Sequence, residues 1–225
     1  MAGKRVLIIF AVIIAAAAGG LAFPFLSTLH INVPPPNTTM WQMGKGSQYL
    51  PHMSYKIDYN GTPYSADIAY KSADLFSLLL THDAKTDIDQ TVNASQVYLF
   101  KGESSKTDPY FEMLDNTIFS MNWYATSPKY LAVGASWGDV YIGSIHEHMR
   151  VRSCGKVDLP FGSLDAQVLS YREIDGSNNT VWIVDNLPLP VMAKYYLPDQ
   201  NLHYSFQMVS LDAKSTPFKP CPGQP

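Results

Sequence analysis

The sequence predicts a mainly β protein with a minor helical part. Its expected architecture is a curved antiparallel sheet, half-barrel or sandwich behind one N-terminal hydrophobic helix. Short segments in which apolar and polar residues alternate recur every ten or so residues, with turn residues between them. The chain shows no internal repeat and no alternation of strands with long helices, so a parallel α/β sheet is not indicated.

The composition favours an exported domain and argues against nucleic-acid binding. The chain has 225 residues, of which 46% are hydrophobic and only 16% are charged, with 14 tyrosines and 16 prolines. Soluble domains average about 25% charged residues. The net charge of −3 is a poor match for nucleic acid, which selects basic surfaces.

Residues 1–30 are expected to direct the chain to the membrane. Lys4 and Arg5 precede an apolar run over residues 6–26. A membrane-spanning helix needs about 20 apolar residues, which this run supplies, and we favour an uncleaved anchor. The alternative is a signal peptide cut near Ala22, which would leave a secreted protein. In both cases the positive-inside rule places the remainder of the chain outside the cytoplasm.

Two further sequence features agree with export. Four sequons are glycosylation acceptors in an exported chain. Their asparagines are Asn37, Asn60, Asn93 and Asn178. The two cysteines, Cys154 and Cys221, either form one disulfide that pins the Pro-rich tail 214–225 or remain free thiols, and we favour the disulfide.

Residues 31–52 are interpreted as a linker because three prolines favour extended polyproline structure. The β domain is expected over residues 53–213. Residues 54–59 and 63–70 should pair as a hairpin, since Asn60-Gly61 is a strong turn signal.

The other predicted elements are mostly strands. Residues 72–83 fit either a short helix or a buried strand. A domain boundary near 130–140 is conceivable, but the pattern favours a single domain. The predicted strands cover 95–102, 116–125, 129–136, 162–174, 180–185 and 202–211.

Residues 155–196 resemble exported prokaryotic and archaeal lipoprotein-carrier (LolA-like) proteins. The positions that carry the resemblance are Pro160, Gly162, Trp182, Pro188, Pro190 and Lys194. The resemblance implies a curved antiparallel sheet with an apolar concave face for lipids or lipid-like chains. It covers about a fifth of the chain, and fold analogy does not confer function.

The stretch SIHEHMR raises the question of a metal site. If residues 140–153 form one strand, the side chains of four residues share a face: His146, His148, Arg150 and Arg152. Two guanidinium groups would repel a divalent cation, and a zinc or copper site needs further ligands. The interpretation we favour is a solvated stripe, followed by an anion or partner contact, and a metal site comes last.

Two other motifs were weighed as catalytic or ion-binding. Ser136 lies in GASWG, which matches the G-x-S-x-G nucleophile elbow, but the β-forming residues after it argue against the helix that the elbow requires. Asp83, Asp87 and Asp89 lack the glycine of a calcium loop and are interpreted as an acidic surface loop.

We therefore expect a membrane-anchored or secreted extracytoplasmic binding domain without catalysis and without a cofactor. Its ligand would be amphiphilic or its partner an envelope protein, with the ligand or partner surface at Trp182, Tyr195, Arg150 and Arg152. The alternatives are an accessory subunit of a membrane complex, and a hydrolase using Ser136 or a metal-binding protein using His146 and His148.

Overall fold

The fold is taken from a computed structural model. It describes residues 39–98, 108–125, 127–142, 145–172, 178–196, 202–213 and 217–221. The predicted membrane segment 6–26 and the sequon at Asn37 lie outside these ranges. None of the helices within these ranges combines the length and the apolarity that a membrane crossing requires.

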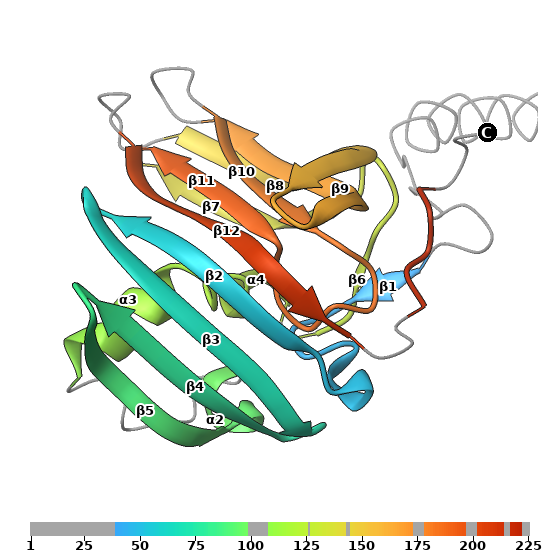
Figure 1. The fold of residues 1–225 in the computed structure, drawn as a ribbon. Helices are drawn as coiled ribbons and strands as arrows, with labels where there is room; N and C mark the ends of the chain where they lie inside the picture. Colours follow the sequence, from blue (N-terminus) through green and yellow to red (C-terminus); the bar gives the residue numbers. More distant parts are fainter. Residues whose placement is uncertain are drawn as a thin grey trace, which may run out of the picture. The chain divides into compact units, whose positions relative to one another are not determined.

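Ten antiparallel strands form one curved sheet, in the order β5-β4-β3-β2-β12-β11-β10-β9-β8-β7 (Figure 1). This confirms the mainly β prediction. In the described residues the edge strands β5 and β7 are not paired with each other. The strands are β2 His52–Tyr59, β3 Thr62–Ser72, β4 Leu75–His82, β5 Lys85–Asn93, β7 Ser136–Ile142, β8 Ile145–Leu159, β9 Gly162–Arg172, β10 Asn178–Ile183, β11 Met192–Tyr196 and β12 Leu202–Asp212.

The sheet consists of two meanders that β12 joins. Strands β2 to β5 follow one another along the chain, as do β7 to β12, and β12 then pairs with β2. In that pairing Phe206 lies opposite Ile57, and both side chains are 2% exposed. The last strand of the chain thus packs against the first strand of the same sheet.

The predicted hairpin is confirmed. Tyr59 pairs with Thr62, so Asn60 and Gly61 are the two turn residues, and both have positive φ, as a type I′ turn requires. The ambiguous segment 72–83 contains strand β4, whose alternate residues are buried. A second two-residue turn at Asp83-Ala84, again with positive φ, connects β4 to β5. The predicted acidic loop is therefore wrong in part, because Asp83 lies in this turn whereas Asp87 and Asp89 lie on strand β5.

Three predicted strands are wrong in whole or in part. The described part of 95–102 belongs to helix α2 (Ala94–Tyr98), and 116–125 contains the end of helix α3 (Pro109–Asn116) and helix α4 (Asn122–Ala125). Only the two residues of β6 (Lys129–Tyr130) are extended at the start of 129–136. Helix α3 begins where Asp108 accepts a hydrogen bond from the Tyr110 amide and Pro109 occupies the first turn.

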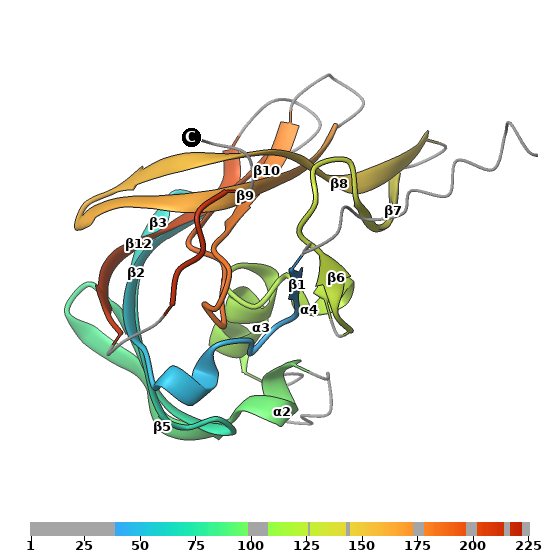
Figure 2. The ribbon, with the colours of Figure 1, turned by 90° about the vertical axis from the view of Figure 1, so that its right-hand side faces the viewer.

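These helices lie against the inner face of the sheet (Figure 2). Phe119, between α3 and α4, is fully buried, and its ring centroid is 6.1 Å from that of Phe76 on β4. Ile118 and Phe119 are β-forming residues that lie outside a strand, and both are fully buried. Their burial in the core outweighs their local preference for extended structure.

The N-terminal part of the described chain belongs to the domain. Residues 39–52, expected to continue the linker, include β1 (Met40–Trp41) and the 3₁₀ helix η1 (Ser47–Tyr49). Trp41 is fully buried, donates its indole N–H to the Leu187 carbonyl at 2.7 Å and stacks on Trp137 with centroids 5.8 Å apart. The linker prediction is therefore wrong for 39–52.

The hollow of the sheet is filled by the protein itself. Side chains from both meanders, the helices and the N-terminal segment form one apolar core. Members with no exposed surface include Trp41, Met53, Ile68, Phe76, Leu78, Leu80, Leu114, Ile118, Phe119, Leu169, Val181 and Met208. The apolar concave face expected for a lipid carrier is thus covered, and the lipid-binding prediction is unsupported.

The predicted disulfide is present. Cys154 on β8 is bonded to Cys221, with Cα atoms 5.6 Å apart. Cys221 is 3% exposed, and the Asn186 amide donates to the Pro217 carbonyl at 2.8 Å, so described tail residues 217–221 are attached to the domain at two points.

Candidate functional site

The four residues of the histidine stripe all lie on one strand, β8, which begins at Ile145. The segment considered as one strand over 140–153 is two strands, because its first residues belong to β7, which ends at Ile142. On β8, Met149 and Val151 are buried while Arg150 and Arg152 are exposed. His148 is half-buried, and the side chain of His146 lies outside the described part.

The low-ranked metal site gains no support. Within the described residues, no three His, Cys, Asp or Glu side chains are grouped so that they could hold a metal ion. A β-bulge at Arg152 also removes that residue from the register, since Val151 pairs with Leu169 and Ser153 with Val168.

Ser136 is not at a nucleophile elbow. It begins strand β7, whereas the elbow requires a helix directly after the serine. His203, the histidine that follows in hydrolase order, lies on β12, five strands away from β7. That separation is about 24 Å along the sheet at about 4.8 Å per strand.

The residues predicted as one ligand surface lie on two faces. Trp182 pairs with Met192, and Ala193 pairs with Val181, so Tyr195 points to the same side as Val181 and opposite to Trp182. Arg150 pairs with Ser170 and shares the outer face with Trp182. Of the four predicted residues, only Tyr195 lines the cavity described next.

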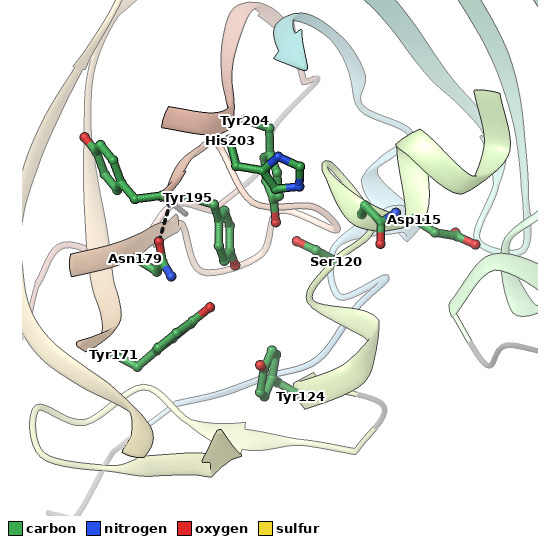
Figure 3. A pocket seen from close by; sticks show the side chains of 10 residues that line it. Asp115, Ser120, Tyr124, Tyr171, Asn179, Tyr195, His203 and Tyr204 are labelled. Atoms are coloured by element: carbon green, nitrogen blue, oxygen red, sulfur yellow. Dashed lines mark hydrogen bonds between the residues drawn. The ribbon is translucent and has the colours of Figure 1, made fainter. Parts of the chain in front are cut away.

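A cavity of about 340 Å³ lies between the helices and the ends of β9 to β12 (Figure 3). Its lining is unusually rich in tyrosine, and it has no lysine or arginine. The lining residues are Asp115, Asn116, Ser120, Tyr124, Tyr171, Asn179, Tyr195, Tyr196, His203 and Tyr204. We call this cavity the tyrosine pocket.

Three tyrosines form one side of the tyrosine pocket. Tyr195 and Tyr204 are stacked with ring centroids 4.4 Å apart, and Tyr171 lies 6.5 Å from Tyr195. The pairing of β11 with β12 places Tyr195 directly opposite Tyr204, which explains the stack. Burial raises the pKa of both hydroxyls far above that of free tyrosine, so each keeps its proton at physiological pH.

Ser120 forms the opposite side, in the turn between α3 and α4. Its side chain points toward Tyr195 and Tyr204 (Figure 3) and partly offsets the rise in their pKa. Ser120 is 8% exposed, yet its Oγ makes no hydrogen bond of acceptable geometry with any described residue. A buried hydroxyl without a partner is costly, about 1–3 kcal/mol, and such groups are rare in native proteins.

Two polar side chains at the tyrosine pocket are held by hydrogen bonds. Asn179, 2% exposed, accepts the Tyr196 backbone N–H at 2.7 Å. His203 Nδ1 and Asn60 Oδ1 share a hydrogen bond of 2.7 Å. The His203 ring also packs against Tyr59, with centroids 5.5 Å apart. Because these contacts fix both groups, this part of the lining is preorganised.

Asp115 supplies the acidic group of the pocket. Burial, followed by repulsion from Glu112, raises the pKa of this carboxyl from 3.8 to about 6. The lining contains no lysine or arginine that would offset the charge of an anionic ligand. The tyrosine pocket therefore suits neutral or cationic ligands better than anions.

A second cavity, of about 300 Å³, lies beside the N-terminal segment. It is lined in part by Gly44, Asp74 and Tyr98. The Tyr98 hydroxyl is hydrogen-bonded to that of Tyr70, and no described residue lining this cavity has a buried side-chain nitrogen or oxygen without a hydrogen-bond partner.

The predicted glycosylation sites can be examined at three positions. Asn60, Asn93 and Asn178 are all exposed. Asn93 accepts hydrogen bonds from the backbone and hydroxyl of Ser95, and Asn60 contacts His203. Their glycan occupancy stays a prediction.

Comparison with known proteins assigns the chain to no family. No protein-family model matches the chain, and no curated protein does. Among solved structures, one described as "Crystal structure of MucB" aligns with 77% of this chain and 56% of its own, at 11% identity and a TM-score of 0.35. We draw no argument from a match at that score, and the LolA-like resemblance stays a prediction.

Proposed function

We propose that this chain is a non-catalytic binding domain that works outside the cytoplasm and holds a small polar molecule in the tyrosine pocket. The observation that carries the proposal is the buried Ser120 hydroxyl, which faces protonated tyrosine hydroxyls but makes no hydrogen bond of acceptable geometry with any described residue. A bound ligand would provide that partner.

Two observations support the compartment. The disulfide between Cys154 and Cys221 belongs to an oxidising environment. The apolar run at residues 6–26, preceded by Lys4 and Arg5, is typical of export and supports attachment to the membrane or secretion.

The test is a binding screen with a variant that blocks the tyrosine pocket. Small neutral, cationic and anionic compounds are screened by ligand-observed NMR against the native protein and against Ser120→Phe, whose ring fills the space in front of the tyrosines. We expect at least one class of compound to bind the native protein and to lose binding in the variant. A screen in which every hit binds Ser120→Phe equally well would refute the proposal.

The alternative of an accessory subunit in a membrane complex remains a prediction. Gentle detergent extraction of the full chain, followed by sizing and mass spectrometry, tests it: a stoichiometric partner would support it, and monomer alone would count against it.

A further inference from the structure

The tyrosine pocket also restricts the chemistry of its ligand, and the inference drawn here rests on the proposed function. Charge gives the first restriction. Asp115 is the one acidic residue of the lining. No lysine or arginine is present to hold a phosphate, sulfate or carboxylate.

The hydroxyl groups give the second restriction. Tyr195, Tyr204 and Ser120 each carry a hydroxyl that can donate one hydrogen bond and accept others. Burial raises the pKa of the two phenols, so they remain donors at neutral pH. A ligand that matches such groups must itself donate and accept at neighbouring atoms, as a chain of hydroxyl groups does.

The aromatic rings give the third restriction. Tyr195 and Tyr204 stack on each other, so their faces are partly used, and Figure 3 shows the hydroxyls of Tyr171 and Tyr195 directed into the pocket. An aromatic cage for a quaternary ammonium group would instead present open ring faces to the ligand. This arrangement disfavours such a cation and favours a ligand with a polar rim and small apolar faces.

Size gives the last restriction. About 340 Å³ is near the lower end of ligand sites, which run from about 300 to 1,000 Å³. A single six-membered sugar ring fits a site of this class, whereas a long acyl chain does not.

We propose that the tyrosine pocket binds a neutral, hydroxyl-rich ring of monosaccharide size, whose hydroxyls hydrogen-bond Ser120 and the tyrosine hydroxyls. Ser120 then gains the partner that it lacks among the described residues. Asn179, fixed by the Tyr196 amide, supplies a further oriented polar group at the same side.

The experiment measures the affinities of defined sugars for the folded protein by NMR titration. The probes are methyl glycosides of glucose, galactose and N-acetylglucosamine, compared with gluconate, glucose 6-phosphate, glucosamine and choline. The variants are Ser120→Ala and Tyr204→Phe, each of which removes one hydroxyl and keeps the surrounding volume. Tyr55→Phe is the matched control, because its buried hydroxyl donates to the Pro190 carbonyl at 3.0 Å and lies outside the pocket lining.

The expected result is saturable binding of at least one neutral glycoside, weakened fivefold or more in Ser120→Ala and Tyr204→Phe and unchanged in Tyr55→Phe. Ser120→Ala should also melt at the same temperature as the native protein or higher, because it removes a buried hydroxyl that has no partner. This combination of equal stability and lower affinity would not follow from a merely structural role.

Different failures are distinguishable. Binding of choline or glucosamine without glycosides, lost in Ser120→Ala, would overturn the sugar inference and leave the proposed function standing. Glycoside binding that neither pocket variant weakens would overturn the placement of the site. If no probe of any class binds, the sugar inference fails, and the wider screen with Ser120→Phe then decides the proposed function.

Discussion

At the scale of single residues, the raised pKa of Asp115 leads to a prediction about stability and pH. Its folded-state pKa of about 6 lies above the ordinary value of 3.8, so the native state binds the proton more tightly than the unfolded state does. The favourable contribution is complete below pH 4 and is lost as the pH rises through 6. Asp115→Asn should therefore raise the unfolding free energy at pH 7.5 by about 1 kcal/mol, because the carboxyl is only half-buried and solvent screens part of the effect, and it should have little effect at pH 4.

Urea unfolding of the native protein and the variant at both pH values measures this difference. The matched control is Asp89→Asn on edge strand β5, an exposed carboxyl away from the helices. Equal stabilisation by Asp115→Asn at pH 4 and pH 7.5 would contradict the assignment.

Substitutions at two glycines with positive φ distinguish the cost of backbone strain from the cost of steric conflict. At Gly46 (φ 93°) an added Cβ would lie 1.9 Å from the Asn186 carbonyl oxygen, while at Gly61 (φ 78°) it would meet nothing within 4 Å. Gly61→Ala should cost about 1–2 kcal/mol for the left-handed conformation alone. Gly46→Ala should cost about 2 kcal/mol more, because the segment at Asn186 must move. Chemical denaturation of both variants measures this, and equal losses would refute the close approach.

Little of the tyrosine pocket could be predicted from the sequence, because its residues come from helices α3 and α4, the turn between them, and four strands, β9 to β12. The sequence points to Tyr195 only as part of a surface with Trp182, and the sheet places these two side chains on opposite faces. Ser120 was missed because it lies in a stretch that was interpreted as a strand. The sequence feature that points to the pocket is the abundance of tyrosine. The alternation of Tyr204 with polar residues predicts which face of β12 is buried, but it does not predict which residues pack against that face.

At the scale of elements, the strands were predictable where one face meets the core and the other meets solvent. Strand β2 of the Asn60-Gly61 hairpin and strand β12 follow that rule, since period-two burial leaves its pattern in the sequence. The helices α2 and α4 were not predictable in this way. They have five and four residues, and they are rich in side chains buried against the sheet, so no helical period could develop.

The disulfide between Cys154 and Cys221 should stabilise the fold and protect the C-terminal tail from proteolysis. It joins residues 67 positions apart, for which loop-closure entropy gives a stabilisation of about 4 kcal/mol. The double variant Cys154→Ser with Cys221→Ser should therefore unfold at lower urea concentration, with a loss of about 2–4 kcal/mol. Protease digestion should also cut the tail near Pro217 faster, because one of the two attachments of residues 217–221 described above would be lost. An unchanged urea midpoint would show that the bond does not stabilise the fold.

At the scale of the whole molecule, the pairing of β12 with β2 determines how the domain unfolds. The two meanders share this one strand pair, the helices pack on the inner face, and Pro35–Pro225 form one compact unit. A boundary near 130–140 would cut between β6 and β7, where Trp41 from the N-terminal segment stacks on Trp137 of β7. The sequence showed each strand separately, but the pairing of the last with the first depends on long-range contacts that no local pattern reveals.

Unfolding should accordingly be a single cooperative transition. Far-UV circular dichroism reports the sheet, and tryptophan fluorescence reports the buried Trp41 and Trp137, so the two signals should give the same midpoint. Phe206→Ala, at the strand pair that joins the meanders, should lower both midpoints together and cost about 3–5 kcal/mol. Phe161→Ala, in the exposed turn between β8 and β9, is the control and should change stability by less than about 0.5 kcal/mol. If Phe206→Ala shifted the circular dichroism midpoint and left the fluorescence midpoint in place, the two meanders would fold independently, and the joining role of β12 would be lost.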